Sequence, residues 1–213
     1  MSKSTKAVLI VIAILIIDQV SKLVVKTNMQ LGESISVLGN WFYIRYIENP
    51  GMAFGWDIPG HFGKIILSLF RLVAIVGIIW YLRGLIRQNA STLLVLSVSM
   101  ILAGAIGNLL DSTFYGLFFD KGTSYDPEYG RWFGYAGQAA FGTPGYAPAF
   151  KGCVVDMLYF PILEGNYPNW FPFKGGDHFI FFRPIFNIAD SAITIGVLLI
   201  LIFQKRLFVN LER

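Results

Sequence analysis

Four long apolar stretches divide the chain, and polar segments separate them. A helix that crosses a bilayer needs about 20 consecutive, mostly apolar residues. Each stretch is close to that length, so the pattern predicts four membrane-spanning helices. We place these spans at about residues 7–25, 65–82, 92–110 and 185–203.

The connection after the first span has the composition of strands. Ser34–Leu38 and Trp41–Ile47 are rich in β-branched and aromatic residues, and the turn-forming pair Gly39-Asn40 separates them. We therefore expect a β hairpin over about residues 31–47. Its aromatic side chains suit the surface of a membrane.

The connection after the third span is long, covering about residues 112–184. Its segment 113–152 is dense in Gly, Phe, Tyr and Pro. Long loops without regular structure are usually functional or mobile. We hypothesise that this aromatic segment lies over a cleft and gates the access of lipid or substrate. The alternative is that its rings rest passively on lipid headgroups.

Composition agrees with the apolar pattern. Apolar residues make up 55% of the 213 residues, charged residues only 14%, and the mean hydropathy is +0.59. Soluble domains carry about 25% charged residues. These values argue against a disordered chain, a nucleic-acid-binding domain and a typical cytosolic enzyme. The single cysteine, Cys153, excludes an internal disulfide and a thiolate metal cage. We expect one all-α integral membrane domain over residues 1–213.

The distribution of charge predicts how the spans are oriented. Lys and Arg gather at the two ends of the chain and in the short link between the second and third spans, whereas the two long connections carry a slight acidic excess. Basic segments stay on the cytoplasmic side of a membrane. Both termini are therefore predicted to be cytoplasmic, with the hairpin and the long loop on the extracytoplasmic side.

Polar side chains interrupt the first and fourth spans. A carboxylate in hydrocarbon is costly unless it is paired, hydrated or protonated. Asp18 and Lys22 share one helix face and can pair, either as an ion pair that ends the span or as groups that contact a substrate. Asn187 and Asp190 also share a face. No basic residue adjoins Asp190, so it needs a partner from elsewhere, and we favour a catalytic or ion-relay role.

The third span ends in a mixture of small and polar residues. Gly104 and Asn108 lie one helical turn apart, and Asp111 follows three residues later. Small residues let another helix approach closely. Close helix packing, or the end of the span at the membrane surface, explains the glycine. Neither explains Asn108 as easily. Arg71, inside the second span, is expected to pair with a polar group of the bundle or to reach the membrane surface.

The candidate chemistry narrows to a pair of carboxyl groups. The two histidines lie in no motif that positions a nucleophile, and the sequence has no H-E-x-x-H, P-loop or G-x-G-x-x-G. Asp156 is an ordinary loop acid unless it meets Asp190. Two close carboxyls share a proton, so one acts as base on a water while the other donates to the scissile carbonyl. Such aspartic peptide hydrolysis needs no metal or cofactor. An ion-coupled transporter and a non-catalytic scaffold remain as competing classes.

Five short motifs occur in a fixed order along the chain. They are Asp18–Lys22 (D-Q-x-x-K), Asn49–Phe54 (N-x-G-x-A-F), Gly104–Asp111 (G-x-x-G-N-x-x-D), Val155-Asp156 and Phe186–Asp190 (F-N-x-A-D). Each is weak alone, but the ordered set with four spans is specific. Through it the chain resembles the bacterial lipoprotein signal peptidases, or type II signal peptidases, which are four-span aspartic peptidases.

The resemblance implies a substrate and a site. The family cuts prolipoproteins just before a diacylglyceryl-modified cysteine at the outer face of the cytoplasmic (inner) membrane, and the hairpin would be its β-cradle. Asp156 and Asp190 would be catalytic. Asn49 and Gly51 would hold the substrate chain, and Asn187 would position Asp190 or the substrate. Residues that would shape or support the site are Asp18, Lys22, Gly104, Asn108 and Asp111.

The resemblance also implies binding partners. We expect prolipoprotein substrates, membrane lipid and globomycin-type inhibitors, no nucleic acid, and a monomer. Two features depart from the family pattern. Ser112 stands where the family usually has an arginine directly after the third-span aspartate, which removes an expected ion-pair partner of Asp111. The segment 113–152 is also longer than is typical.

Overall fold

The computed structural model describes residues 1–51 and 60–207, with only the backbone of 60–62. Four of its helices are long and apolar enough to cross a membrane, as the pattern of apolar stretches predicts. The helices extend beyond the apolar stretches because their polar end residues continue the same hydrogen-bonding pattern. Their bounds are α1 Lys3–Asn28, α2 Gly60–Arg87, α3 Thr92–Leu110 and α5 Ile188–Leu207.

Helix α3 is the central helix of the bundle, and it packs against α1, α2 and α5. Glycines set its distance from α5. A Cβ at Gly104 would collide with the backbone oxygen of Ala189, and one at Gly196 would lie 2.6 Å from the backbone oxygen of Ser97. The expected packing role of Gly104 is therefore observed. Close packing here brings the polar end of α3 against the first turn of α5.

A four-stranded antiparallel sheet stands at one end of the bundle, in the order β1-β2-β5-β8. The expected hairpin is seen as β1 and β2, with a turn at Gly39. It is part of a larger sheet because β5 and then β8 add to its edge. The strands are β1 Ser34–Leu38, β2 Phe42–Asn49, β5 Val154–Tyr159 and β8 Ile185–Phe186.

The start of the fourth span differs from the prediction. Residues 185–186 form strand β8 rather than helix, and α5 begins at Ile188. Apolar residues that continue a span cannot be told from a short buried strand by hydropathy alone. Pairing of β8 with β5 fixes where the chain enters the helix.

The long connection has more structure than the sequence indicated. The end of α3 continues as a π-helical turn, Asp111–Tyr115, and a short helix α4, Gly116–Phe118. Two small hairpins follow. Their strands are β3 Ser124–Asp126, β4 Arg131–Phe133, β6 Leu163–Asn166 and β7 His178–Phe181. Several aromatic side chains of 113–152 are buried against α1, β2 and β5, among them Phe119 and Tyr115.

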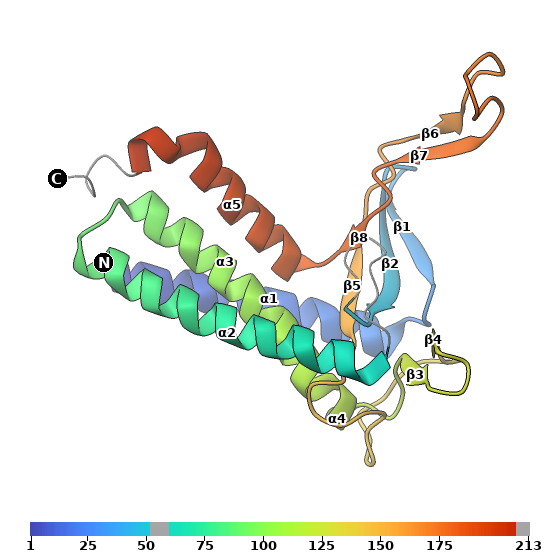
Figure 1. Cartoon of the computed structure of the whole chain (residues 1–213), viewed down its shortest axis with the longest axis horizontal. Coiled ribbons are helices and arrows are strands. Elements are labelled where there is room, and N and C mark those ends of the chain that lie inside the picture. Colours follow the sequence, from blue (N-terminus) through green and yellow to red (C-terminus); the bar gives the residue numbers. More distant parts are fainter. Residues whose placement is uncertain (52–59, 208–213) are drawn as a thin grey trace.

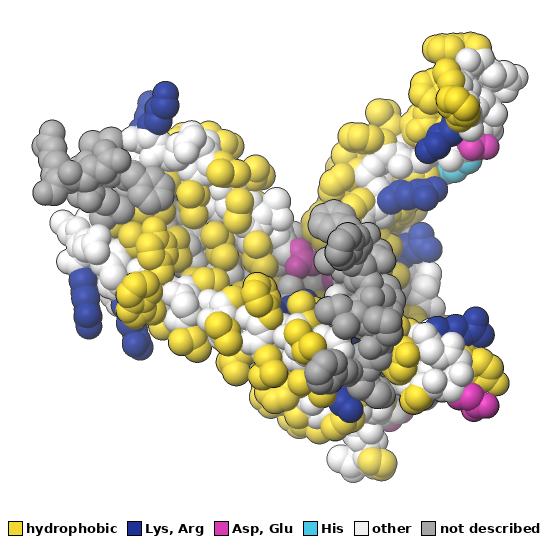
Figure 2. Space-filling model, viewed as in Figure 1, with side chains coloured by type: hydrophobic (Ala, Val, Ile, Leu, Met, Phe, Trp, Pro, Cys, Tyr) yellow, Lys and Arg dark blue, Asp and Glu magenta, His cyan; other side chains and the backbone are white. Residues whose placement is uncertain are grey.

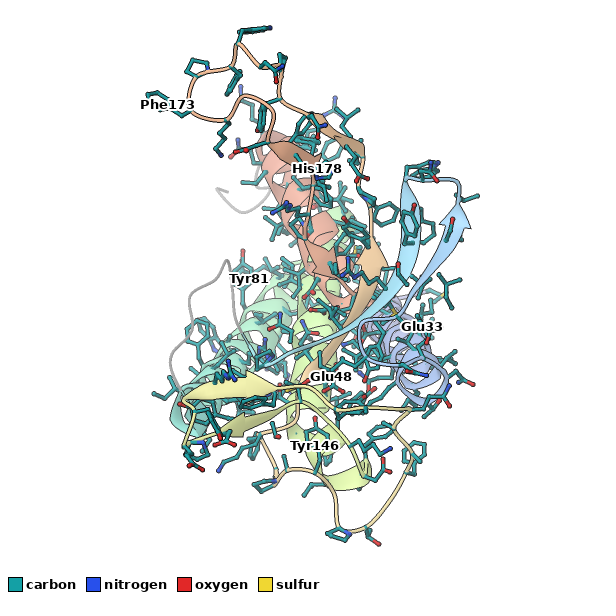
Figure 3. All side chains as sticks on the ribbon, turned by 90° about the vertical axis from the view of Figure 1, so that its right-hand side faces the viewer. Glu33, Glu48, Tyr81, Tyr146, Phe173 and His178 are labelled. Carbon is teal, nitrogen blue, oxygen red and sulfur yellow. The ribbon has the colours of Figure 1, made fainter. Side chains whose placement is uncertain are left out.

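The helices and the sheet meet at an angle (Figure 1). The N-terminus and the end of α5 lie at the end of the bundle remote from the sheet, and the β6–β7 hairpin extends away from the helices. Apolar side chains cover the helices, and acidic atoms are visible in the angle between bundle and sheet (Figure 2). Phe173, at the tip of the β6–β7 hairpin, is far from Glu48 and Tyr146, which lie near one another at the base of the sheet (Figure 3).

Candidate active site

A buried lysine organises the polar cluster between α1 and α3. Lys22 Nζ lies 2.9 Å from Asp18 Oδ2, 2.9 Å from Asp111 Oδ2 and 3.1 Å from Asn108 Oδ1. The side chains of Lys22, Asp18 and Asp111 are fully buried. An ammonium has three protons, and each has an acceptor. The Asp18–Lys22 pair is therefore not a snorkelling pair at the end of a span.

Asp18 and Asp111 also hold backbone groups of other elements. Asp18 Oδ1 accepts the backbone N–H of Ala189 in the first turn of α5 at 2.9 Å. Asp111 Oδ2 accepts the backbone N–H of Val155 in β5 at 3.2 Å. The amide of Gln19 donates to both carboxylates, at 3.0 and 2.8 Å. The absence of an arginine at position 112 therefore leaves Asp111 well supported.

Asn187 is the N-cap of α5 and connects the two candidate catalytic residues. Its Oδ1 accepts the backbone N–H of Asp190 at 2.8 Å, so its amide nitrogen faces the other way. That nitrogen donates to Asp156 Oδ1 at 2.7 Å and to the backbone oxygen of Val155 at 3.3 Å. One capped helix end thus places Asp190 beside the middle of β5.

Asn108 holds the side chain of Asp190. Because the Lys22 ammonium can only donate, the oxygen of the Asn108 amide must face Lys22. The Asn108 nitrogen then donates to Asp190 Oδ1 at 2.8 Å. Lys22 in this way fixes the orientation of the amide that binds Asp190.

Asp156 is in an environment that favours its neutral form. Its side chain is buried, and burial, together with the charge of Asp190, raises the pKa of Asp156 to about 7. The hydrogen bond from Asn187, the charge of Lys22 and the hydrogen bond from Asn49 oppose that rise in pKa. Asp190 is half-buried. The structure thus gives the two acids different environments at one place.

The second motif continues the site along β2. Asn49 is paired with Val154 of β5. Its Oδ1 accepts the N–H of Gly51 at 2.8 Å, which forms a tight turn. Gly51 has a φ of +105°, and a Cβ there would lie 2.5 Å from Leu67 Cδ2, so glycine is needed on two counts. The remaining motif residues, Met52, Ala53 and Phe54, lie outside the described residues.

Arg71 of α2 points into the bundle. Its Nη1 donates to Ser112 Oγ at 3.1 Å, which confirms the expected pairing with a polar group of the bundle. Ser112 Oγ in turn donates to the backbone oxygen of Asn108 at 3.1 Å. A position where the family pattern has arginine therefore receives a guanidinium from another helix.

A second buried ion pair was missed by the sequence analysis. Lys26 pairs with Glu48 of β2 and also donates to Tyr46 Oη at 3.3 Å and to the backbone oxygen of Lys121 at 3.1 Å. The rings of Phe119, Tyr135 and Tyr146 surround its ammonium. The signal was available, because Lys26 follows Lys22 by one helical turn. This pair fixes part of 113–152 against α1, and the gating role of that segment stays a prediction.

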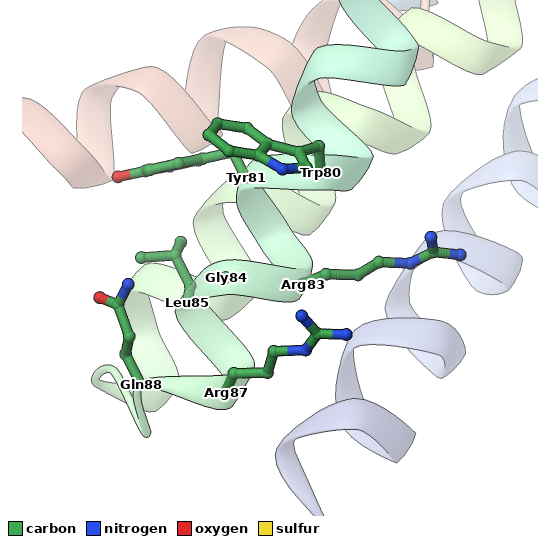
Figure 4. Close-up of a pocket in the computed structure, with 7 residues that line it drawn as sticks. All are labelled: Trp80, Tyr81, Arg83, Gly84, Leu85, Arg87 and Gln88. Atoms are coloured by element: carbon green, nitrogen blue, oxygen red, sulfur yellow. The ribbon is translucent and has the colours of Figure 1, made fainter.

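The pocket drawn in Figure 4 is remote from this cluster. It has a volume of about 630 Å³ and lies at the C-terminal end of α2, remote from the sheet. Its lining residues are Trp80, Tyr81, Arg83, Gly84, Leu85, Arg87 and Gln88. Since it contains no acid and no motif residue, we do not connect it with the chemistry of the cluster.

In the part of the chain that the structure describes, no group of three or more His, Cys, Asp and Glu is placed to hold a metal ion. The Lys22 ammonium lies between the carboxylates of Asp18 and Asp111. What the arrangement offers is a pair of acids, one buried with a raised pKa and one half-buried, held by two asparagines. That arrangement can perform acid and base catalysis on a water.

Comparisons with known proteins agree with this geometry. A family model described as signal peptidase (SPase) II matches residues 10–206. A lipoprotein signal peptidase of Porphyromonas gingivalis is 46% identical over 201 residues, covering 92% of this chain and 81% of the relative. One of Amoebophilus asiaticus is 38% identical, covering 89% and 73%.

Solved structures show the same fold. A bacterial membrane enzyme determined by the in meso method at 2.3 Å resolution superposes with a TM-score of 0.58 and 25% identity, covering 97% of this chain and 91% of that one. The resemblance drawn from the five motifs is confirmed. The chain belongs to the signal peptidase II family of membrane aspartic proteases.

Proposed function

We propose that this chain removes signal peptides from diacylglyceryl-modified prolipoproteins by aspartic catalysis, cutting before the lipidated cysteine. Asp156 and Asp190 are the catalytic pair. The relatives' names support the substrate class. The observation that carries the mechanism is that both acids meet at Asn187, although 34 positions separate them in the sequence.

Burial indicates which acid holds the shared proton. Asp190 is half-buried, and its Oδ1 accepts a hydrogen bond from Asn108. Asp156 has a raised pKa of about 7 because it is buried beside Asp190. Asp156 is then the protonated partner and Asp190 the base, although the two titrate as a unit.

The reaction follows from these protonation states. Asp190 takes a proton from a water as the water oxygen attacks the scissile carbonyl carbon, and Asp156 gives its proton to the carbonyl oxygen. Collapse of the tetrahedral intermediate returns a proton to Asp156. Asp190 passes its proton to the leaving nitrogen, which becomes the new amino terminus of the lipidated cysteine. Both acids are restored, and no cofactor takes part.

The membrane position of the site supports the same substrate. The charge distribution predicts cytoplasmic termini. The start of α5, with Asp190 in its first turn, lies at the end of the helices next to the sheet. The pair would then face the outer leaflet, where a diacylglyceryl group is anchored. Asn49, at the end of β2, hydrogen-bonds to Asp156, and Gly51 follows directly after the strand. These two residues would hold the extended substrate chain. A globomycin-type inhibitor would occupy the same place.

The test is cleavage of a diacylglyceryl-modified prolipoprotein by purified full-length protein in detergent. Wild type is compared with Asp190→Asn and Asp156→Asn, which keep shape and remove the titrating group. Asp177→Asn is the matched control, because Asp177 is exposed on the β6–β7 hairpin. We expect wild type and the control to cleave and both site variants to lose activity by a factor of 10³ or more, roughly the cost of losing an essential catalytic group.

Two results would count against the proposal. Full cleavage by Asp190→Asn, in protein that is still folded, would show that the dyad assignment is wrong. Absence of cleavage by wild type on any lipidated substrate would favour the transporter or scaffold class instead. A globomycin-type inhibitor that blocks wild-type cleavage would support the site independently of the variants.

A further inference from the structure

Arg71 is a charged side chain inside an apolar membrane helix that the proposed mechanism does not use. The residues that follow it in α2 are apolar for several turns toward the C-terminal end of the helix. A charge in such a position is costly and marks a function by default. The guanidinium turns inward, where Nη1 donates to Ser112 Oγ on the π-helical turn that follows α3.

The contact with Ser112 has a defined direction. Ser112 Oγ gives its one proton to the backbone oxygen of Asn108, so its lone pairs face Arg71. The small serine side chain leaves space for the guanidinium beside α3. Asn108, one turn earlier, donates to Asp190. Arg71 is thus held next to the residue that binds Asp190.

The carboxyl groups around the site outnumber the lysine among them. Lys22 is shared by Asp18 and Asp111, and its charge also acts on Asp156. The catalytic pair adds a further negative charge when it is singly ionised. Lys64 of α2 donates to Cys153 Sγ at 3.1 Å and lies over the Trp132 ring, so it serves a different place.

Arg71 is a second cation near the pair, and it is linked to Asp190 through Ser112 and Asn108. The carboxyl groups whose charges act on its guanidinium are Asp190, Asp111 and Asp156. They come from α5, from the end of α3 and from β5, which are the three elements that meet at the site. A positive charge near two carboxyls stabilises their singly ionised state relative to the fully protonated one.

We propose that Arg71 is a positioning residue that holds the Asp156–Asp190 pair in its singly ionised, active form from across the bundle. The inference rests on the proposed aspartic mechanism. It gives a residue of α2 a role in catalysis, although Arg71 belongs to none of the five motifs. It also gives the serine at position 112 a purpose, because that serine receives the arginine.

The test is the pH dependence of cleavage, measured for wild type, Arg71→Gln, Arg71→Leu and Arg71→Lys. Removal of the positive charge makes both carboxyls harder to ionise, so both limbs of the bell-shaped profile move to higher pH. We expect a shift of about one pH unit for Arg71→Gln and Arg71→Leu. Arg71→Lys retains the charge and is expected to keep the wild-type optimum. Arg71→Leu suits the apolar helix and gives a folded variant if Arg71→Gln does not.

The matched control is Arg83→Gln, which removes the same charge from the other end of the same helix. Arg83 is exposed there, and its profile should coincide with that of wild type. A uniform loss of activity in Arg71→Gln and Arg71→Leu, with no displacement of the profile, would overturn the inference and leave Arg71 a structural role only. Unchanged profiles would overturn it as well. Failure of the aspartic mechanism would show separately, as cleavage by Asp190→Asn.

Discussion

Substitution of Lys22 by methionine should destabilise the whole bundle. Methionine has a similar length and no charge, so the change removes three hydrogen bonds from a fully buried ammonium and leaves Asp18 and Asp111 facing each other. Breaking a buried ion pair in this way costs about 3–5 kcal/mol. For a chain of this size, each kcal/mol lowers the melting temperature by about 2–4 °C. We therefore expect a fall of about 6–20 °C.

The measurement is thermal unfolding of purified protein in one detergent at neutral pH. Lys6→Met is the control, because Lys6 is exposed on the same helix, and it should melt within about 1 °C of wild type, as surface changes usually do. Adding Asp111→Asn to Lys22→Met removes one uncompensated charge and should recover part of the loss. If Lys22→Met melts within about 3 °C of wild type, or if the second change deepens the loss, the ammonium does not organise this cluster as reasoned.

Two further predictions concern groups outside the helices. Asp156→Asn should raise the melting temperature by more at pH 8 than at pH 5. Folded Asp156 has a pKa of about 7 against an ordinary 3.8, so wild type loses stability as pH rises between these values; an equal gain at both pH values would contradict the burial argument. Glu48→Gln leaves buried Lys26 without its carboxylate. It should increase the rate at which a protease cuts within 113–152, whereas Glu33→Gln, on the surface, should not; equal rates would show that the ion pair does not hold the segment.

The sequence predicted the polar cluster better than the sheet. Asp18, Lys22 and Asn108 could be identified because charged and amide groups in apolar helices are costly and therefore conspicuous. Glu48 was not identified, because an acid in an extended segment has no such contrast with its neighbours. Its significance depends on Lys26, which lies 22 positions away.

The meeting of Asp156 with Asp190 depends on strand pairing that the sequence alone does not determine. Register between β5 and β8 pairs Leu158 with Phe186 and so places the N-cap Asn187 beside Asp156. Helical periodicity predicts the face of α5 on which Asp190 lies, but it does not predict which strand faces it. The same limit applies to Arg71, whose partner on the turn after α3 is 41 positions away.

The hydrogen bond from Ala189 to Asp18 joins the first and last helices across 171 positions of the chain. During synthesis the first and third helices are made early, and Lys22 can already neutralise Asp18 and Asp111 between them. Asp156 and Asp190 come later, and Asp190 arrives only with the final helix. A nascent chain can therefore enter the bilayer with the charges of Asp18 and Asp111 compensated before the proposed catalytic pair is assembled.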